Sequence, residues 1–488
     1  MSDLRIRGRS LPVRRATALG AVLAGLLLIL GGGTFLGEER PASDDSRIPL
    51  IGRTTSICTS PAPPSGEPRG KTEVSVVSIR EVPDQTGLLT GSTLQSKPLD
   101  LKLTAPGKGA QLPGVTSTVM ISADGAMASA SSAVIVGDVL EGPEAGLKAA
   151  PCLAPATSHW FAGLTASDAD RTDLILTNPD DAQAQVDLRF YGQSGRVAVP
   201  GSPGIVIGAH ESRTVSLSSL VEAEGALSVA VQASQGRITA VAKRTQTVQL
   251  KRAGVDWQLP SATPSSVVVI PGIPEDSGSR QLVVANPSHT RASVAVQVLG
   301  LQGPYEPAEA GSLDVPPEST ATVNLEKGLA GQAGSVKLTS NVPVTGSVIS
   351  TSQRGGAAPD LAVQSAAVPL IGTGVSALAT SNIADSVLVV SNSGDDDAQI
   401  SFEVLSYDGV RLRTVDTVLG PNTSATRRLN SPAPSYVVVK VPPGSSVVGG
   451  VVLTQPNRNV AGLATIPLGS PDLSSRAPAT RPDSSAGR

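Results

Sequence analysis

The sequence predicts an all-β protein built from tandem immunoglobulin-like β-sandwich repeats after one N-terminal transmembrane helix. Three observations carry this prediction: a passage written three times at a spacing of roughly 105 residues, short apolar runs separated by turn residues, and an apolar N-terminal stretch behind a run of arginines. A β-propeller-like closed array of the same repeats is the alternative architecture, because the ends of the units could pair with the units that follow.

The repeated passage consists of an apolar run, an Asn, and a second apolar run that begins eight residues later. An Asn side chain can cap a turn, and a following Pro presets φ near about −65°. The third copy has Ser-Gly after its Asn where the others have Pro, which predicts a looser turn there. These structural turn residues are Asn178, Pro179, Asn286, Pro287 and Asn392.

Each copy contains about seven short strand-like runs, which is the scale of an immunoglobulin-like sandwich. The alternation in 186–190 and 294–298 indicates strands with one buried face. The three predicted repeats are 158–262, 263–369 and 370–468. Residues 71–157 lack the Asn-Pro element and are expected to be a divergent first β unit, in which 127–136 reads as a strand.

The N-terminus predicts a membrane anchor. Residues 1–15 form a basic tail, expected to be cytoplasmic, and the apolar residues 16–36 are long enough to cross a bilayer core of about 30 Å as a helix. A cleaved signal peptide is the alternative, and either segment exports the rest of the chain. Residues 37–70 are expected to be a flexible stalk and 469–488 a disordered tail, because both are rich in Pro, Ser and Gly.

Two cysteines in an exported chain predict a disulfide between Cys58 and Cys152. Both lie in a Cys-x-x-Pro-Ala context, which suggests equivalent places in successive units. Closing so long a loop would stabilise the fold by about 4–5 kcal/mol in the chain-entropy model. Unpaired thiols are the alternative, and neither Cys has a partner at zinc-ligand spacing.

The charge balance and the scarce histidines favour a non-catalytic protein. A net charge of −3 gives no basic footprint for nucleic acid. His210 and His289 fall in polar turns of the repeat, and His159 precedes an aromatic pair at a unit boundary, where packing is the expected role. No catalytic residue or cofactor is predicted, although a Ser/His/Asp triad has no fixed sequence spacing by which it could be excluded.

Asp395–Asp397 occupies the turn after the third Asn. Clustered carboxylates at a sandwich edge could bind Ca²⁺, but an exposed turn kept soluble by its charge is the preferred interpretation.

The arginine-rich N-terminus with its anchor, Cys152-x-x-Pro155, Trp160-Phe161-Ala162-Gly163 and the repeated Asn-Pro passage together resemble an uncharacterised family of exported, membrane-anchored actinobacterial envelope proteins. The resemblance implies an extracytoplasmic location and brings no catalytic residues. We therefore expect a single-pass membrane protein, most of it outside the cell, that acts as a scaffold or binding module for an envelope protein or glycan. An exported hydrolase or a regulator of envelope polysaccharide synthesis is the alternative function.

Overall fold

The computed structural model describes residues 52–60, 70–80, 86–139, 141–142, 144–222, 225–248, 251–275, 278–352, 357–455 and 461–471. They belong to one compact unit, Ile51–Ser475. Nearly all regular structure in these residues is β, which confirms the all-β prediction; the helices described are α2 (Ala126–Ala130), α3 (Glu326–Leu329) and the 3₁₀ turn η1 (Leu217–Ser219). No described helix is long and apolar enough to span a membrane. The predicted anchor, 16–36, lies outside the described residues.

The first β unit contains two four-stranded antiparallel sheets. In spatial order they are β1 (Arg53–Cys58), β6 (Val119–Gly125), β3 (Gly87–Thr93) and β4 (Pro98–Leu103), and then β5 (Gly109–Pro113), β2 (Lys71–Ser78), β7 (Ser131–Val139) and β8 (Gly146–Pro151).

Two expectations for this unit are wrong. The predicted stalk, 37–70, contains β1, because β1 pairs along its whole length with β6 and ends in a buried Cys58. The predicted strand 127–136 begins instead in α2, and β7 starts only at Ser131. A short apolar run does not by itself distinguish a buried helical turn from a strand.

The first repeat has the same plan. One sheet contains β12 (Gly195–Val197), β11 (Ala184–Gly192), β15 (Leu227–Gln235) and β9 (Ser158–Leu164), with β13 (Ile205–Ile207) also paired to β11; the other contains β14 (Glu211–Ser216), β10 (Asp170–Asn178), β16 (Thr239–Val248) and β17 (Lys251–Gln258).

In the second repeat a single long strand, β24 (Gly334–Ser352), serves both sheets. The first part of β24 pairs with β18 (Ser265–Ile273) and with β20 (Ala292–Gly300). Strand β20 pairs in turn with β21 (Gly303–Tyr305) and β22 (Ser312–Val315). The second part of β24 pairs with β25 (Asp360–Ser365) and with β19 (Arg280–Asn286), which also pairs with β23 (Ser319–Asn324).

The third repeat returns to two separate sheets. They are β26 (Thr373–Leu378), β31 (Ser435–Lys440), β28 (Ala398–Ser406) and β29 (Arg411–Leu419), and then β30 (Thr423–Arg428), β27 (Asp385–Asn392), β32 (Val447–Gln455) and β33 (Gly462–Pro467).

Alternating side chains build an apolar core between the two sheets of each unit. In β20, for example, Ala292, Val294 and Val296 are buried, whereas Ser293 and Ala295 between them are exposed. This period of two is the pattern expected for strands with one face on a core. Burial of these Val, Leu and Ile side chains is the main stabilising contribution, at about 25 cal/mol per Å² of apolar surface.

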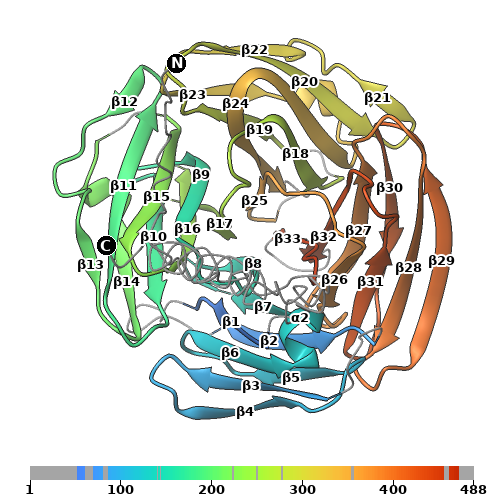
Figure 1. Ribbon diagram of the computed structural model, residues 1–488. Helices are drawn as coiled ribbons and strands as arrows, with labels where there is room; N and C mark the ends of the chain where they lie inside the picture. The colour runs from blue at the N-terminus through green and yellow to red at the C-terminus, as the bar shows by residue number, and fades with distance from the viewer. Residues whose placement is uncertain are drawn as a thin grey trace, which may run out of the picture. The chain divides into compact units, whose positions relative to one another are not determined.

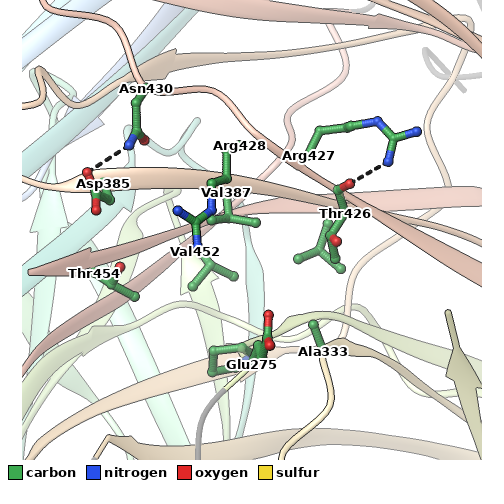
Figure 2. A pocket seen from close by; sticks show the side chains of 12 residues that line it. Glu275, Ala333, Asp385, Val387, Thr426, Arg427, Arg428, Asn430, Val452 and Thr454 are labelled. Carbon is green, nitrogen blue, oxygen red and sulfur yellow. Dashed lines mark hydrogen bonds between the residues drawn. The ribbon is translucent and has the colours of Figure 1, made fainter. Parts of the chain in front are cut away.

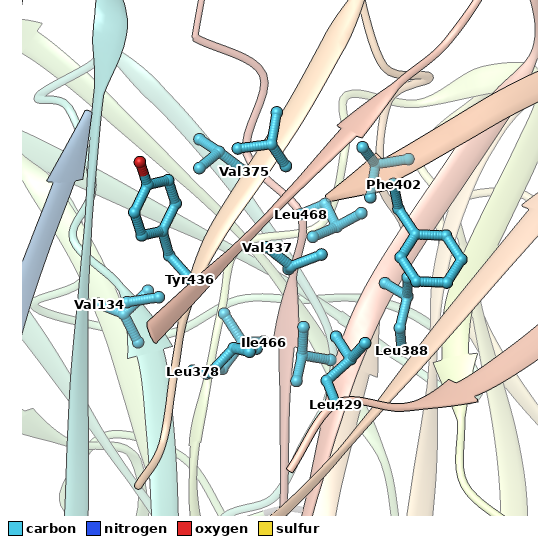
Figure 3. Packing of buried hydrophobic residues seen from close by; sticks show 14 of the residues in the cluster. Val134, Val375, Leu378, Leu388, Phe402, Leu429, Tyr436, Val437, Ile466 and Leu468 are labelled. Carbon is cyan, nitrogen blue, oxygen red and sulfur yellow. The ribbon is translucent and has the colours of Figure 1, made fainter. Parts of the chain in front are cut away.

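The four units follow one another around a centre, and the last packs against the first (Figure 1). The strands nearest the centre are β8, β17, β25 and β33, one from each unit, and each packs mainly against two of the others. At the closure, Val134 and Leu147 of the first unit share one apolar cluster with Tyr436 and Ile466 of the third repeat. Figure 3 shows part of this cluster, with Val134 beside Tyr436.

All four central strands meet at the carboxylate of Asp360. The Oδ2 atom accepts hydrogen bonds from the amides of Leu147 and Leu463, both at 3.0 Å. The Oδ1 atom accepts one from the amide of Val255 at 3.2 Å and one from Nη2 of Arg252 at 2.9 Å. Asp360 is fully buried, so this one residue of β25 joins β8, β17 and β33 by bonds that water does not screen.

Glycines make room for this carboxylate. Gly146, Gly254 and Gly462 precede the three donating amides, and their positions in the strand pairing correspond to that of Asp360. A Cβ atom on Gly146 would lie 2.7 Å from the Arg252 guanidinium and 2.8 Å from the Asp360 carboxylate. Gly146 and Gly254 also have φ of +145° and +143°, which other residues rarely adopt. Three of the four equivalent positions therefore hold Gly, and the fourth holds Asp.

The buried carboxylate predicts a pH dependence of stability. Burial raises the pKa of Asp360 to about 7, against the opposing effects of Arg252 and the three amides. The unfolded chain releases this proton near pH about 4, so between about pH 4 and 7 the folded state holds more protons and its stability falls as the pH rises. We expect the free energy of unfolding of the wild type, measured in urea relative to Asp360→Asn, to decline across this window and to be level above it. If the free energy of unfolding of the wild type relative to Asp360→Asn rises or stays constant from about pH 4 to 7, the pKa of Asp360 is not raised.

Candidate functional site

A cleft of about 690 Å³ lies between the second and third repeats (Figure 2). It is lined by β27, β30 and β32 of the third repeat on one side and by residues next to β18 and β24 of the second on the other: Pro274, Glu275, Ala333, Asp385, Val387, Val389, Thr426, Arg427, Arg428, Asn430, Val452 and Thr454. This volume is within the range of small-molecule sites, about 300–1,000 Å³.

The floor of the cleft is one face of the sheet β30-β27-β32. Strand register places Val387 opposite Arg428 on one side and opposite Val452 on the other, so these three side chains form a row across the sheet. Val389 and Thr426 form a parallel row beside it. Because residues directly opposite in a sheet share a face, the register alone sets a guanidinium next to an apolar surface of three valines.

Polar groups surround this floor. Figure 2 shows the Arg428 guanidinium directed into the cleft above Val452, with Glu275 on the facing wall. Within the part of the chain that the structure describes, no side chain or carbonyl bonds that guanidinium. Asn430 donates a hydrogen bond to Asp385 at 2.8 Å, which holds both side chains at the rim. Arg427 instead turns away and donates to its neighbour's carbonyl at 2.9 Å.

The Arg in the row Arg428–Val387–Val452 is specific to the third repeat. The register that sets Arg428 against Val387 sets Asn324 against Gln281 in the second repeat and Ser216 against Asp173 in the first. In both the second and the third repeat part of this face packs against the preceding unit: Val283 and Ile349 share an apolar cluster with Ala162, and Val389 and Val452 share one with Ala362. The copies differ in the residue at the end of this row, and the third copy has an Arg whose guanidinium has no bonding partner among the described residues.

This arrangement is suited to binding a ligand that has both an anionic group and an apolar part. An Arg guanidinium beside an apolar surface recognises carboxylate or phosphate through charge-assisted hydrogen bonds, while the valines remove apolar surface of a ligand from water. The Asp385–Asn430 pair and Thr454 add donors and acceptors that could fix the orientation of a bound molecule.

The predicted turn residues lie away from this cleft and share one structural role. Asn178, Asn286 and Asn392 end β10, β19 and β27 and are almost fully buried. In each copy the side-chain amide donates to three backbone carbonyls and Oδ1 accepts a backbone amide two residues later at 3.0 Å. Pro179 and Pro287 follow the first two; the third copy keeps the same set of bonds without Pro.

Cys58 and Cys152 form a disulfide, as predicted. It joins the end of β1 to the residue after β8, which are the innermost strands of the two sheets of the first unit. Trp257 of the first repeat packs into the same apolar core. The bridge thus ties the two sheets of the first unit together next to the first repeat.

The remaining candidates have structural surroundings. His159 is buried, its Nε2 lies 2.9 Å from the carbonyl of Ile238, and burial lowers the pKa of its imidazole. His210 and His289 contact carboxylates in exposed turns, Asp181 at 2.8 Å and Glu318 at 3.5 Å.

Asp395–Asp397 follows β27 in its turn, where the Asp396 carbonyl accepts a bond from Asn392. Among the described residues, no group of three or more His, Cys, Asp or Glu is placed to hold a metal ion.

Sequence reasoning missed Arg428. A pair of arginines near the end of a strand is usually exposed to solvent, so it did not indicate a site. The signal that could have found Arg428 was a comparison of the three copies, because the first two have Val-Ser and Val-Asn at 215–216 and 323–324. It also missed Asp360, because an Asp beside Pro at the start of a strand looks like an ordinary turn residue.

The fold and the cleft together define a class: an all-β repeat protein whose units meet at a common centre, with a candidate binding cleft between two of them. The chain belongs to a family of unknown function (DUF5719), whose model matches residues 103–429. No curated protein matches the chain.

Proposed function

We propose that this protein is a non-catalytic binding module of the cell envelope, anchored by residues 16–36 and exposed outside the membrane, that holds an anionic ligand in the cleft between the second and third repeats. The ligand carries one carboxylate or phosphate on a partly apolar body. The tandem sandwich units supply a rigid frame for this site. The observation that carries the proposal is the Arg428–Val387–Val452 row, which places an unengaged guanidinium against an apolar floor.

The cleft supports binding better than turnover. Arg428 lies in one row with valines, and of the two carboxylates that line the cleft, Asp385 is engaged by Asn430 and Glu275 lies on the facing wall. His159, the histidine closest to a unit boundary in the sequence, is buried in another part of the fold and bonded to a backbone carbonyl. The basic N-terminal tail and the disulfide support the extracytoplasmic placement, because disulfides persist in oxidising compartments.

Calorimetric titration of the full chain with hexyl phosphate tests the site. We expect saturable binding that is stronger than that of hexanol, which lacks the anion, and of inorganic phosphate, which lacks the apolar body. Arg428→Leu should weaken hexyl phosphate binding by about tenfold or more, because a hydrogen bond to a charged group contributes about 1.5–3 kcal/mol.

Arg427→Leu is the matched control, since it removes the same charge from the same strand while the guanidinium points away from the cleft. We expect it to change the affinity by less than about threefold, because an exposed charge is screened by salt. Equal losses in the two variants, or equal affinity for hexyl phosphate and hexanol, would exclude the proposed site. Protease accessibility in intact cells tests the location separately: the β units should be cleaved from outside.

A further inference from the structure

The outermost strands of three units carry features that block pairing with another chain. In the first unit β4 is short, begins at Pro98 and bears Asp100 and Lys102. In the first and second repeats the outer strand is divided into two short pieces, and Pro200, Pro203 and Pro307 lie in the breaks. Short strands, prolines and charges are the usual means by which sheet edges avoid edge-to-edge association.

The outermost strand of the third repeat is not divided and contains no proline, although it bears Arg411, Arg413 and Asp416 and its pairing with β28 shifts register at Leu412. Strand β29 runs from Arg411 to Leu419, and among the described strands it pairs with β28 alone (Figure 1). Leu412 and Val418 on this strand are 51% and 56% exposed. One long edge with free backbone donors and acceptors and exposed apolar side chains is therefore presented to solvent.

The sequence of β29 is complementary to itself in one antiparallel register. When Val415 pairs with Val415 of a second copy, Leu412 faces Val418, and Thr414 faces Asp416. In the same register Arg411 faces Leu419 and Arg413 faces Thr417, so no like charges are opposed. Shifting the centre to Arg413 or to Asp416 would oppose two arginines or two aspartates, which destabilises a strand pair.

We propose that β29 is a dimerisation edge, at which two copies of this chain pair antiparallel about a two-fold axis through Val415 and join their sheets into one. The contact is isologous, so it closes at two copies. Main-chain hydrogen bonds supply the affinity, and the Leu412–Val418 pairs with the arrangement of charges fix the register.

Sedimentation velocity of the full chain in mild detergent is the first test, with a concentration-dependent dimer as the expected result. Leu412→Glu places a carboxylate opposite Val418 and should raise the dimer dissociation constant at least about tenfold. The double variant Leu412→Glu/Val418→Lys sets Glu against Lys in the proposed register and should restore the wild-type constant. Val206→Glu, at an exposed position on the divided outer strand of the first repeat, is the control and should have no effect.

A second measurement does not depend on dimer stability. The two native cysteines form the disulfide, so Val415→Cys introduces one free thiol, which the two-fold axis sets opposite its own copy. We expect this variant to oxidise to a covalent dimer, and Val410→Cys, outside the strand, to remain monomeric. A monomeric wild-type chain, a double variant no tighter than Leu412→Glu, or equal cross-linking of both cysteine variants would overturn the proposal.

Discussion

Asp360→Leu is expected to destabilise the protein by about 3–5 kcal/mol, because removal of one partner leaves the other charge and its hydrogen-bond donors buried without compensation. The Arg252 guanidinium would lose its ion pair, and the amides of Leu147, Val255 and Leu463 would lose their acceptor. Since these donors come from three other units, we expect their central strands to loosen together. Urea unfolding monitored by far-UV circular dichroism measures the change.

Two comparisons separate this effect from a general sensitivity to substitution. Asp180→Asn breaks a half-exposed ion pair with Arg237 and should cost about 0–1 kcal/mol. The double variant Asp360→Leu/Arg252→Leu removes both charges and should be more stable than Asp360→Leu alone. If Asp360→Leu cost no more than Asp180→Asn, the carboxylate would not be holding the units together.

Removal of the disulfide is the second large effect. The chain-entropy model gives about 4–5 kcal/mol for a loop of this length, because the bridge restricts the unfolded chain between residues 94 apart. We expect Cys58→Ala/Cys152→Ala to unfold at correspondingly lower urea concentration than the oxidised wild type. Both cysteines contribute to the core of the first unit, so some lost packing adds to the effect.

Reductant provides the internal control for this prediction. The wild type treated with dithiothreitol should approach the stability of the double alanine variant, which should itself be insensitive to the treatment. A double variant within about 1 kcal/mol of the oxidised wild type would show that the unfolded chain is already restricted at these positions.

The sequence was sufficient to predict those strands and turns that depend on local residue patterns. The apolar runs before each repeated Asn correspond to β10, β19 and β27, because each Asn closes its strand through the same local set of bonds. The cysteine pairing was also predictable, since two cysteines leave one intramolecular choice. By contrast, β1 was assigned to a linker, because the pairing that orders it involves β6, distant in sequence.

The parts that escaped prediction depend on contacts between units. Asp360 has no local signature, since three of its partners lie on strands more than a hundred residues away and come close only when all the units are assembled. Arg428 likewise becomes distinctive only when strand register sets it beside Val387 and when the second and third repeats together enclose the cleft that it lines. Composition and periodicity describe each strand, but not which faces the neighbouring units cover.

The arrangement of three glycines and one aspartate makes the repeats non-interchangeable. A chain in which the first repeat replaced the second would carry Gly254 in place of Asp360 and would present four sets of donors to an empty centre. A chain with the second repeat in duplicate would force two carboxylates into space made for one. Each repeat is therefore suited to its own place in the order, because the residue that it contributes to the centre must match those of the other units.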